Sequence, residues 1–473
     1  MVIKRLSEKY YWGIVFVIAF IMHLSLIGGK YIWADEAYSF AMIKHSFKDI
    51  FRITAADVHP PLYYFGLKVF LAPFRNNLYM AKVFSVIPYL LILIIGYKNI
   101  SEISNPKVAL IFCVLFVSFP FSLYYSYEVR MYSWACFFVF SSFLYAIRSY
   151  ETGSTRHFLV YTIMTICAAY THYFSLVAVG LIAFILLVAM IVKKKDIKKY
   201  LFFLIACVGL YSPWLGSFLK QLEDKVNNEY WIERINRYTL LSWWKEVFGL
   251  EGIDCYYLIY SLLFVILFLY LLNSKNNKFI SLSLFSLVII GGTAFIGIAL
   301  SVLVRPIFII RYISPMIPCL ILPIAFSISS IRNRYVVYGL LALYIIAGAI
   351  NYKSKLCDEY ANIPNSLDEA FVENDSDAYV IYTYAQVASV LAYYENEKPI
   401  YGDLDTSLQA NPFENRFELN KLRYNDYETI IVMCEKESEA PQIEGFEKNY
   451  ITTLNVTGMM TDTYKYQREN AFE

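Results

Sequence analysis

The stretch Trp33-Ala34-Asp35-Glu36-Ala37-Tyr38 decides which fold the sequence predicts. It follows an apolar segment, 11–27, that is long enough to cross a bilayer. Two adjacent carboxylates therefore stand at a membrane edge, where a charge is costly unless water, a partner or a function stabilises it. A second unusual stretch, Asp57-Val58-His59-Pro60-Pro61-Leu62-Tyr63-Tyr64, follows in the same loop. We therefore expect the rest of the chain to be a membrane scaffold that holds this loop.

The composition is that of a polytopic α-helical membrane protein. Hydrophobic residues make up 58% of the 473 residues, the mean hydropathy is +0.47, and 17% of the residues are charged. A soluble globular chain is closer to half apolar. The sequence has no basic domain of the kind that nucleic-acid binding requires. The composition thus predicts the lipid bilayer as a partner and argues against nucleic acid.

The apolar runs predict about eleven membrane-spanning helices. Every second connecting segment is basic and almost free of acids, most clearly 193–199 with its five lysines. The positive-inside rule then places the N-terminus in the cytoplasm, and an odd number of spans places the tail after residue 351 outside the plasma membrane. The predicted spans are 11–29, 79–97, 108–125, 131–147, 158–171, 173–192, 200–218, 256–272, 279–300, 312–329 and 335–351.

The predicted outer segments differ from the inner ones. The first, 30–78, suggests two interfacial helices near 35–50 and 60–74, the second of which begins at a Pro-Pro pair suited to a first helical turn. The other long outer segment, 219–255, is rich in charge and tryptophan.

Residues 352–473 form a second predicted domain, separate from the membrane domain 1–351. This tail is polar, with β-rich runs at 378–383 and 428–433 and a helix-like run at 385–394 between them. Strands that alternate with helices predict a small extracytoplasmic α/β domain. Two cysteines of the tail, Cys357 and Cys434, could pair outside the cell, and the sequence does not decide whether they do.

Asp35 and Glu36 have two interpretations. Asp35 could be a helix N-cap, with Glu36 favoured by the helix dipole. Alternatively, one carboxylate is a general base on an acceptor hydroxyl, and the other holds substrate or a divalent cation, because a carboxylate beside an apolar site can have a raised pKa.

Two histidines also fall in predicted outer segments. His59 precedes the Pro-Pro pair, where it either belongs to a solvated turn or lines the same cavity as Asp35. His172 lies in a short turn between two spans, and for this residue a structural role is the stronger interpretation.

Three arginines complete the set of candidates. Arg130 lies in a short outer turn, where it either pairs with Glu128 or binds a lipid phosphate bidentately. Arg305 and Arg311 lie on the predicted outer side, against the positive-inside trend, and we favour a role in meeting an anionic lipid headgroup.

Taken together, these motifs resemble the GT-C class of integral membrane glycosyltransferases over residues 1–351. The resemblance is closest to the bacterial branch of the dolichyl-phosphate-mannose:protein mannosyltransferase family, and the lipid A aminoarabinose transferase is also similar. The motifs that carry it are Asp35-Glu36, His59-Pro60-Pro61-Leu62, Glu128-x-Arg130-x-Tyr132, Pro213-Trp214 and Arg311-Tyr312-x-x-Pro315.

The resemblance implies an inverting sugar transfer from a polyprenyl-phosphate donor to a cell-envelope acceptor at the outer leaflet. It makes Asp35 the catalytic aspartate. It places Glu36, His59, Arg130 and Arg311 around donor and acceptor. The other candidate substrate-binding residues are Tyr132, His172, Arg305 and Tyr312.

Two other functions compete with this expectation. A polysaccharide polymerase or ligase would use an oligosaccharide donor and a late outer loop, a part that 219–255 could play. A transporter or flippase of a lipid-linked sugar would more often show internal repeats and broken helices at mid-bilayer, and we find no repeat in the sequence.

Overall fold

The structure is a computed structural model of the chain. The residues that it describes are 2–28, 32–227, 232, 234–249, 256–361, 376–395, 397–402, 411–456 and 459–469.

The contacts divide the chain into two compact units. The first, here called the membrane unit, comprises Met1–Gly28, Val58–Tyr63 and Tyr79–Asp358. The second, here called the outer unit, comprises Gly29–Asp57, Tyr64–Leu78 and Glu359–Glu473. Most of the first predicted outer loop is therefore grouped with the tail. The predicted division into functional domains, 1–351 and 352–473, stays a prediction.

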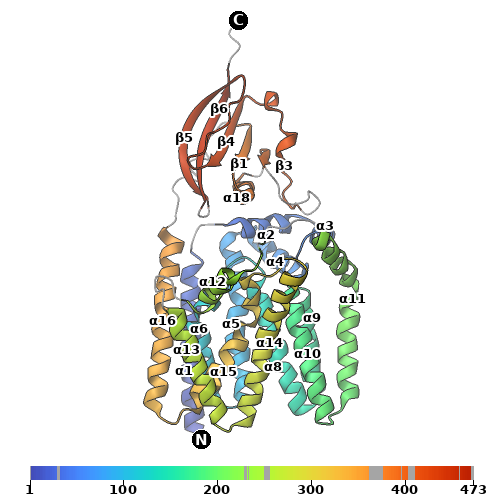
Figure 1. Ribbon diagram of the computed structural model, residues 1–473, viewed down its shortest axis with the longest axis vertical. Helices are drawn as coiled ribbons and strands as arrows, with labels where there is room; N and C mark the ends of the chain where they lie inside the picture. Colours follow the sequence, from blue (N-terminus) through green and yellow to red (C-terminus); the bar gives the residue numbers. More distant parts are fainter. Residues whose placement is uncertain are drawn as a thin grey trace. The chain divides into compact units, whose positions relative to one another are not determined.

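The described part of the membrane unit is helical (Figure 1). Its elements, in chain order, are α1 (Val2–Leu26), α5 (Leu78–Ile103), α6 (Pro106–Ser118), α7 (Pro120–Tyr124), α8 (Tyr132–Thr152), α9 (Thr155–Ala169), α10 (Tyr173–Val192), α11 (Ile197–Asn227), α12 (Arg237–Phe248), α13 (Tyr256–Asn273), α14 (Asn277–Leu303), η2 (Ile310–Met316), α15 (Ile317–Ser330) and α16 (Arg334–Ala361).

Within the described residues, eight helical segments are long and apolar enough to cross a membrane. They coincide with predicted spans and confirm a polytopic helical protein. The other three predicted spans coincide with α6, α8 and α9, of which α6 has 13 residues and α9 has 15. A helix of that length covers about 20 Å, less than the hydrocarbon thickness of about 30 Å. The full number of eleven spans therefore stays a prediction.

The centre of the membrane unit is formed by α15, which is buried on all sides from Ile317 to Ile328. Such a helix has no polar face, because every side of it meets another helix. Small residues allow close packing elsewhere: a Cβ added at Gly348 of α16 would lie 2.7 Å from the Cα atom of Ser118. By contrast, α1 and α11 expose most of their apolar side chains, as helices that face lipid do.

The first outer loop contains three α-helices where the sequence predicted two. These are α2 (Ala34–Lys44), α3 (Phe47–Ala56) and α4 (Leu62–Leu71), which continues as the 3-10 turn η1 (Ala72–Phe74). The prediction of one helix over 35–50 is wrong, because the Ser46 side chain accepts the Asp49 backbone N–H (3.2 Å) and starts a new helix there.

The tail folds into a mixed six-stranded sheet of order β3-β2-β1-β4-β6-β5. Its first half is parallel, with α18 (Ala385–Tyr394) connecting β1 to β2, and its last two strands are antiparallel. The strands are β1 (Ala378–Tyr382), β2 (Ile400–Gly402), β3 (Arg416–Glu418), β4 (Thr429–Glu435), β5 (Phe446–Val456) and β6 (Met459–Arg468). The predicted α/β domain, with strands at 378–383 and 428–433 and a helix at 385–394, is confirmed.

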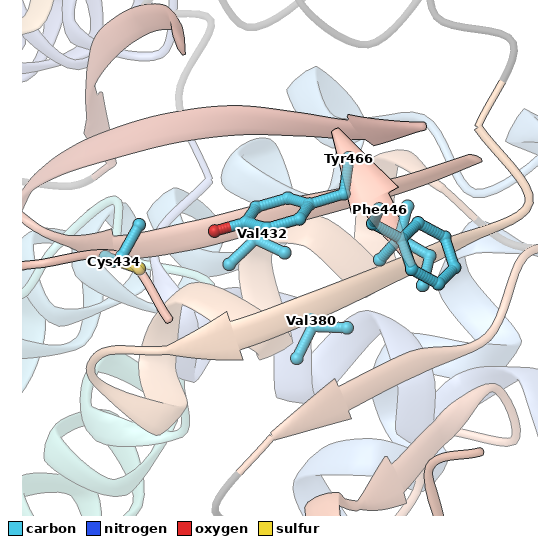
Figure 2. Packing of buried hydrophobic residues seen from close by; sticks show 7 residues of the cluster. Val380, Val432, Cys434, Phe446 and Tyr466 are labelled. Atoms are coloured by element: carbon cyan, nitrogen blue, oxygen red, sulfur yellow. The ribbon is translucent and has the colours of Figure 1, made fainter. Parts of the chain in front are cut away.

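One face of this sheet carries a compact hydrophobic core. Figure 2 shows Val380 of β1, Val432 and Cys434 of β4, Phe446 of β5 and Tyr466 of β6 packed together. Cys434 is thus a buried small hydrophobe, and both Cys434 and Cys357 are free thiols.

Candidate active site

The membrane unit gathers aromatic and basic side chains around His172. The His172 ring lies 4.9 Å from that of Tyr312, 5.7 Å from that of His59 and 5.8 Å from that of Tyr132. These residues come from four places in the sequence, namely η2, the loop before α4, the first turn of α8 and the N-cap of α10. We call the set formed by these four residues and Arg130 and Arg311 the arginine cluster.

The His172 ring is neutral, and a hydrogen bond to the backbone identifies which of its two nitrogens carries the hydrogen. Its Nδ1 accepts the backbone N–H of Phe174 (3.2 Å), as the N-cap of α10. Burial first, and then the charges of Arg130 and Arg311, together lower the pKa of His172 to about 3. Since Nδ1 is an acceptor, Nε2 carries the hydrogen and is available to donate.

Arg130 and Arg311 both belong to this cluster. The charges of both guanidinium groups act on His172 and on the hydroxyl of Tyr132. Arg130 is 5% exposed, and its backbone N–H donates to the carbonyl of Glu128 (2.7 Å) in a tight turn before α8. Arg311 lies in η2, a 3-10 segment that contains Pro315. Two cations at one site, the buried Arg130 and the half-buried Arg311, are suited to an anion with several oxygens.

One acid near this cluster, Glu246, is not among the candidate residues predicted from the sequence. Glu246 of α12 accepts the hydroxyl of Tyr125 (3.2 Å) and interacts with the charge of Arg311. Burial raises the pKa of Glu246. The adjacent Trp243 packs on Phe308, with ring centroids 5.4 Å apart. Glu246 belongs to the predicted outer segment 219–255, which is rich in charge and tryptophan. The composition of this segment draws attention to the segment as a whole but does not distinguish Glu246 from its other charged residues.

A small cavity of about 20 Å³, lined in part by Tyr132, adjoins the cluster. Two buried serines that line it, Ser133 and Ser314, have hydroxyls without a hydrogen-bond partner among the described residues. The cavity therefore combines an apolar wall with polar groups near Tyr132. Its lining residues are Tyr89, Ile92, Phe116, Phe121, Ser122, Tyr125, Ser126, Tyr132, Ser133, Cys136, Ser314 and Ile317.

Asp35 and Glu36 belong to the outer unit, in the first turn of α2. The N-cap of this helix is Trp33, so the interpretation of Asp35 as the cap is wrong. Glu36 is 4% exposed, and its Oε2 accepts the backbone N–H of Trp33 (3.3 Å), a contact that stabilises the helix start. Asp35 is half-buried, and its carbonyl accepts the hydroxyl of Ser39 (3.1 Å).

The remaining candidates are placed as follows. Arg305 follows the end of α14, where its backbone N–H donates to the carbonyl of Leu300 (3.1 Å). It is not one of the six residues that make up the arginine cluster as defined above. Within the described residues, no group of three or more His, Cys, Asp or Glu side chains could hold a metal ion. A divalent cation at Asp35 and Glu36 stays a prediction.

No family model and no curated protein matches the sequence. Among solved structures, ArnT from Cupriavidus metallidurans in the apo state is similar, with a TM-score of 0.67 and 11% identity over 96% of this chain and 97% of that chain. The same protein bound to undecaprenyl phosphate is similar with a TM-score of 0.62 and 11% identity over 96% and 98% of the two chains. The expected resemblance is therefore confirmed at the level of the fold: this chain has the fold of ArnT over almost its whole length.

Proposed function

We propose that this chain is an inverting glycosyltransferase, which moves a sugar from a polyprenyl-phosphate donor to a glycan, lipid or protein acceptor of the cell envelope. The observation that carries the proposal is the arginine cluster, in which the rings of Tyr312, next to Arg311, and of Tyr132, two residues after Arg130, lie 4.9 and 5.8 Å from the ring of His172. The fold shared with ArnT supports it, as does the undecaprenyl phosphate bound in one ArnT structure.

The arginine cluster has the chemistry of a donor phosphate site. A guanidinium fork binds phosphate oxygens bidentately, and the Nε2–H of His172 can donate a further hydrogen bond without adding charge. Negative charge grows on the bridging oxygen of the donor as the anomeric bond breaks. Arginines aimed at that oxygen stabilise the transition state more than the ground state, which raises turnover.

We assign the proton transfer to Asp35. The acceptor hydroxyl oxygen attacks the anomeric carbon from the face opposite the phosphate, the carbon–phosphate-oxygen bond breaks, and the hydroxyl proton moves to the Asp35 carboxylate. Polyprenyl phosphate leaves with the bonding electrons, and the anomeric configuration is inverted. Glu36 is less suited to this step, because its carboxylate is engaged in the capping contact with Trp33.

The donor class follows from the proposed topology. We propose that the N-terminus is cytoplasmic and residues 352–473 are extracytoplasmic, since the predicted inner segments are short and basic. Nucleotide sugars are made in the cytoplasm, so a donor used on the outer side has to carry its own activation energy across the membrane. A polyprenyl-phosphate sugar does so.

The test is a transfer assay with purified protein, a polyprenyl-phosphate sugar and envelope glycan acceptors, in the absence of nucleotides. We expect release of polyprenyl phosphate and a product with the inverted anomeric configuration by NMR. Activity that requires a nucleotide sugar, or a product with retained configuration, would rule out the proposed reaction.

One observation favours a second candidate, a polysaccharide polymerase or ligase. It is the contact between Tyr125 and Glu246, which ties the second outer segment to the neighbourhood of Arg311. Such an enzyme would transfer an oligosaccharide in one step, so the mass added to the acceptor distinguishes the two. A flippase would move the lipid-linked sugar between leaflets without releasing polyprenyl phosphate.

A further inference from the structure

The helix that carries Asp35 is packed on the C-terminal domain. Within the outer unit, α2 lies against α18 (Figure 1). The rings of Phe40 on α2 and Tyr393 on α18 meet edge to face, with centroids 5.1 Å apart. At the other end of α2, the Nε2–H of His45 donates to the carbonyl of Pro412 (2.7 Å). The position of α2 therefore depends on residues that lie more than 300 positions later in the sequence.

Beside these contacts lies a buried cation, Arg416 of β3. It is 7% exposed, its guanidinium stacks over the ring of Phe413 with the Cζ atom 5.0 Å from the ring centroid, and one of its N–H groups donates to the hydroxyl of Ser389 on α18. Ser389 belongs to α18, the helix against which α2 packs. Arg416 is thus connected to α2 through α18.

The surroundings of Arg416 are unusual for a buried charge. Among the described residues no carboxylate pairs with it, and its Nε has no hydrogen-bond partner. Burial lowers the pKa of Arg416 to about 10, so the side chain keeps its charge at neutral pH. A buried cation without an ion pair contributes little to the stability of the folded protein, since an apolar side chain of similar volume commonly stabilises the fold as well or better. Its presence calls for a role other than holding the domain together.

We propose that the C-terminal domain positions Asp35 by fixing α2, and that Arg416 is the positioning residue of this contact. The proposal rests on the proposed function, in which Asp35 takes the acceptor proton. Asp35 lies on the same helix as Phe40, the α2 residue whose ring meets Tyr393 of α18. A displacement of about 1 Å at a reacting group can cost ~100-fold in rate. A small shift of α2 would therefore lower turnover without weakening donor binding.

The experiment uses the full-length purified protein and four variants. Arg416→Met removes the guanidinium and keeps the apolar stem, Arg416→Lys keeps the charge, and Tyr393→Leu weakens the same contact from α18. Arg423→Met is the matched control, because Arg423 is an exposed arginine of the same domain. We expect Arg416→Met and Tyr393→Leu to lower kcat about 10- to 100-fold with an unchanged KM for the lipid donor. Arg416→Lys should recover part of kcat, and Arg423→Met should match the wild type.

Hydrogen exchange on the same samples separates positioning from folding. In Arg416→Met, amides of α2 should exchange faster while those of β4 and β6 keep wild-type protection, and the pH profile of kcat should keep its shape because Arg416 does not touch the reacting atoms. Wild-type kcat in both Arg416→Met and Tyr393→Leu would overturn the proposal. So would a loss of kcat accompanied by lost protection of β4 and β6 in both variants.

The Asp35→Asn variant distinguishes a failure of the positioning role from a failure of the proposed function. If Asp35→Asn is inactive while Arg416→Met and Tyr393→Leu turn over normally, only the positioning role fails. If Asp35→Asn turns over normally, the proposed function loses its base, and the positioning role fails with it.

Discussion

The ring of His172 at the N-terminus of α10 lies 4.9 Å from that of Tyr312, the residue that follows Arg311 in η2. This contact joins a turn in the first half of the membrane unit to a 3-10 segment near its end. It thereby brings the charge of Arg311 to the same ring that the charge of Arg130 reaches. The donor site that we propose depends on this meeting of distant segments.

Asp35→Asn should abolish turnover. The substitution keeps the size of the side chain but removes the oxygen that takes the proton, and a positioned general base contributes ~10²–10⁴-fold. Initial rates of polyprenyl phosphate release would measure the loss, and a fluorescent donor analogue would show unchanged binding. The control is Asp426→Asn, a change at an exposed carboxylate of the tail. Near-normal turnover in Asp35→Asn would remove this residue from the reaction.

Full turnover should require an arginine, and not only a positive charge, at both Arg130 and Arg311. Lysine keeps the charge but loses the bidentate fork, so each Arg→Lys variant should lower kcat and each Arg→Ala variant should lower it further, by roughly 10²–10³-fold. Steady-state kinetics with the lipid donor would measure both effects. Arg332→Lys, at an exposed arginine, provides the control. Wild-type kinetics in both alanine variants would place the phosphate elsewhere.

His172 should make the folded protein sensitive to mild acid. Its pKa is about 3 when folded and near 6.5 when unfolded, so between these values the unfolded state binds more protons. The stability that neutral His172 contributes is fully present above pH 6.5 and is lost as the pH falls toward 3. Between pH 6.5 and pH 5 the loss is about 2 kcal/mol.

The measurement is the thermal unfolding midpoint of wild type and His172→Gln at pH 7.5 and pH 5. The glutamine variant lacks the titrating group, so its midpoint should fall less on acidification than that of the wild type. An equal or larger fall in the variant would show that His172 is not buried in the neutral form.

The topology predicts which side of the membrane the tail occupies. Single cysteines introduced at exposed tail positions should react with a membrane-impermeant maleimide on intact cells, if the native thiols are first replaced by serine or alanine. Gln467 of β6 is one suitable exposed site. Cysteines at Lys194, in a predicted inner segment, should react only after lysis. The reverse pattern would place the arginine cluster in the cytoplasm.

Local sequence patterns determined the elements of this protein well. The run 173–192 coincides with α10, the run 385–394 coincides with α18, and 256–272 differs from α13 by one residue at its end. Long apolar runs and short β-rich runs are visible without knowledge of partners, because they report how each segment meets lipid or a core. Arg305 and Arg311 were recognised for a similar reason, since arginines on the predicted outer side depart from the positive-inside trend.

Only the tertiary structure decided which segments meet. The packing of α2 on α18, the contact of Glu246 with Tyr125 and the hydrogen bond of His45 to Pro412 each join residues more than 100 positions apart. The break between α2 and α3 also escaped the sequence, because Ser46 looks like any polar residue until its hydroxyl accepts the Asp49 backbone N–H. The periodicity of a sequence shows which face of a helix is apolar. It does not show which other helix or sheet that apolar face will pack against. That choice follows from the complementary shapes and charges of the folded units, and it is made only when they pack.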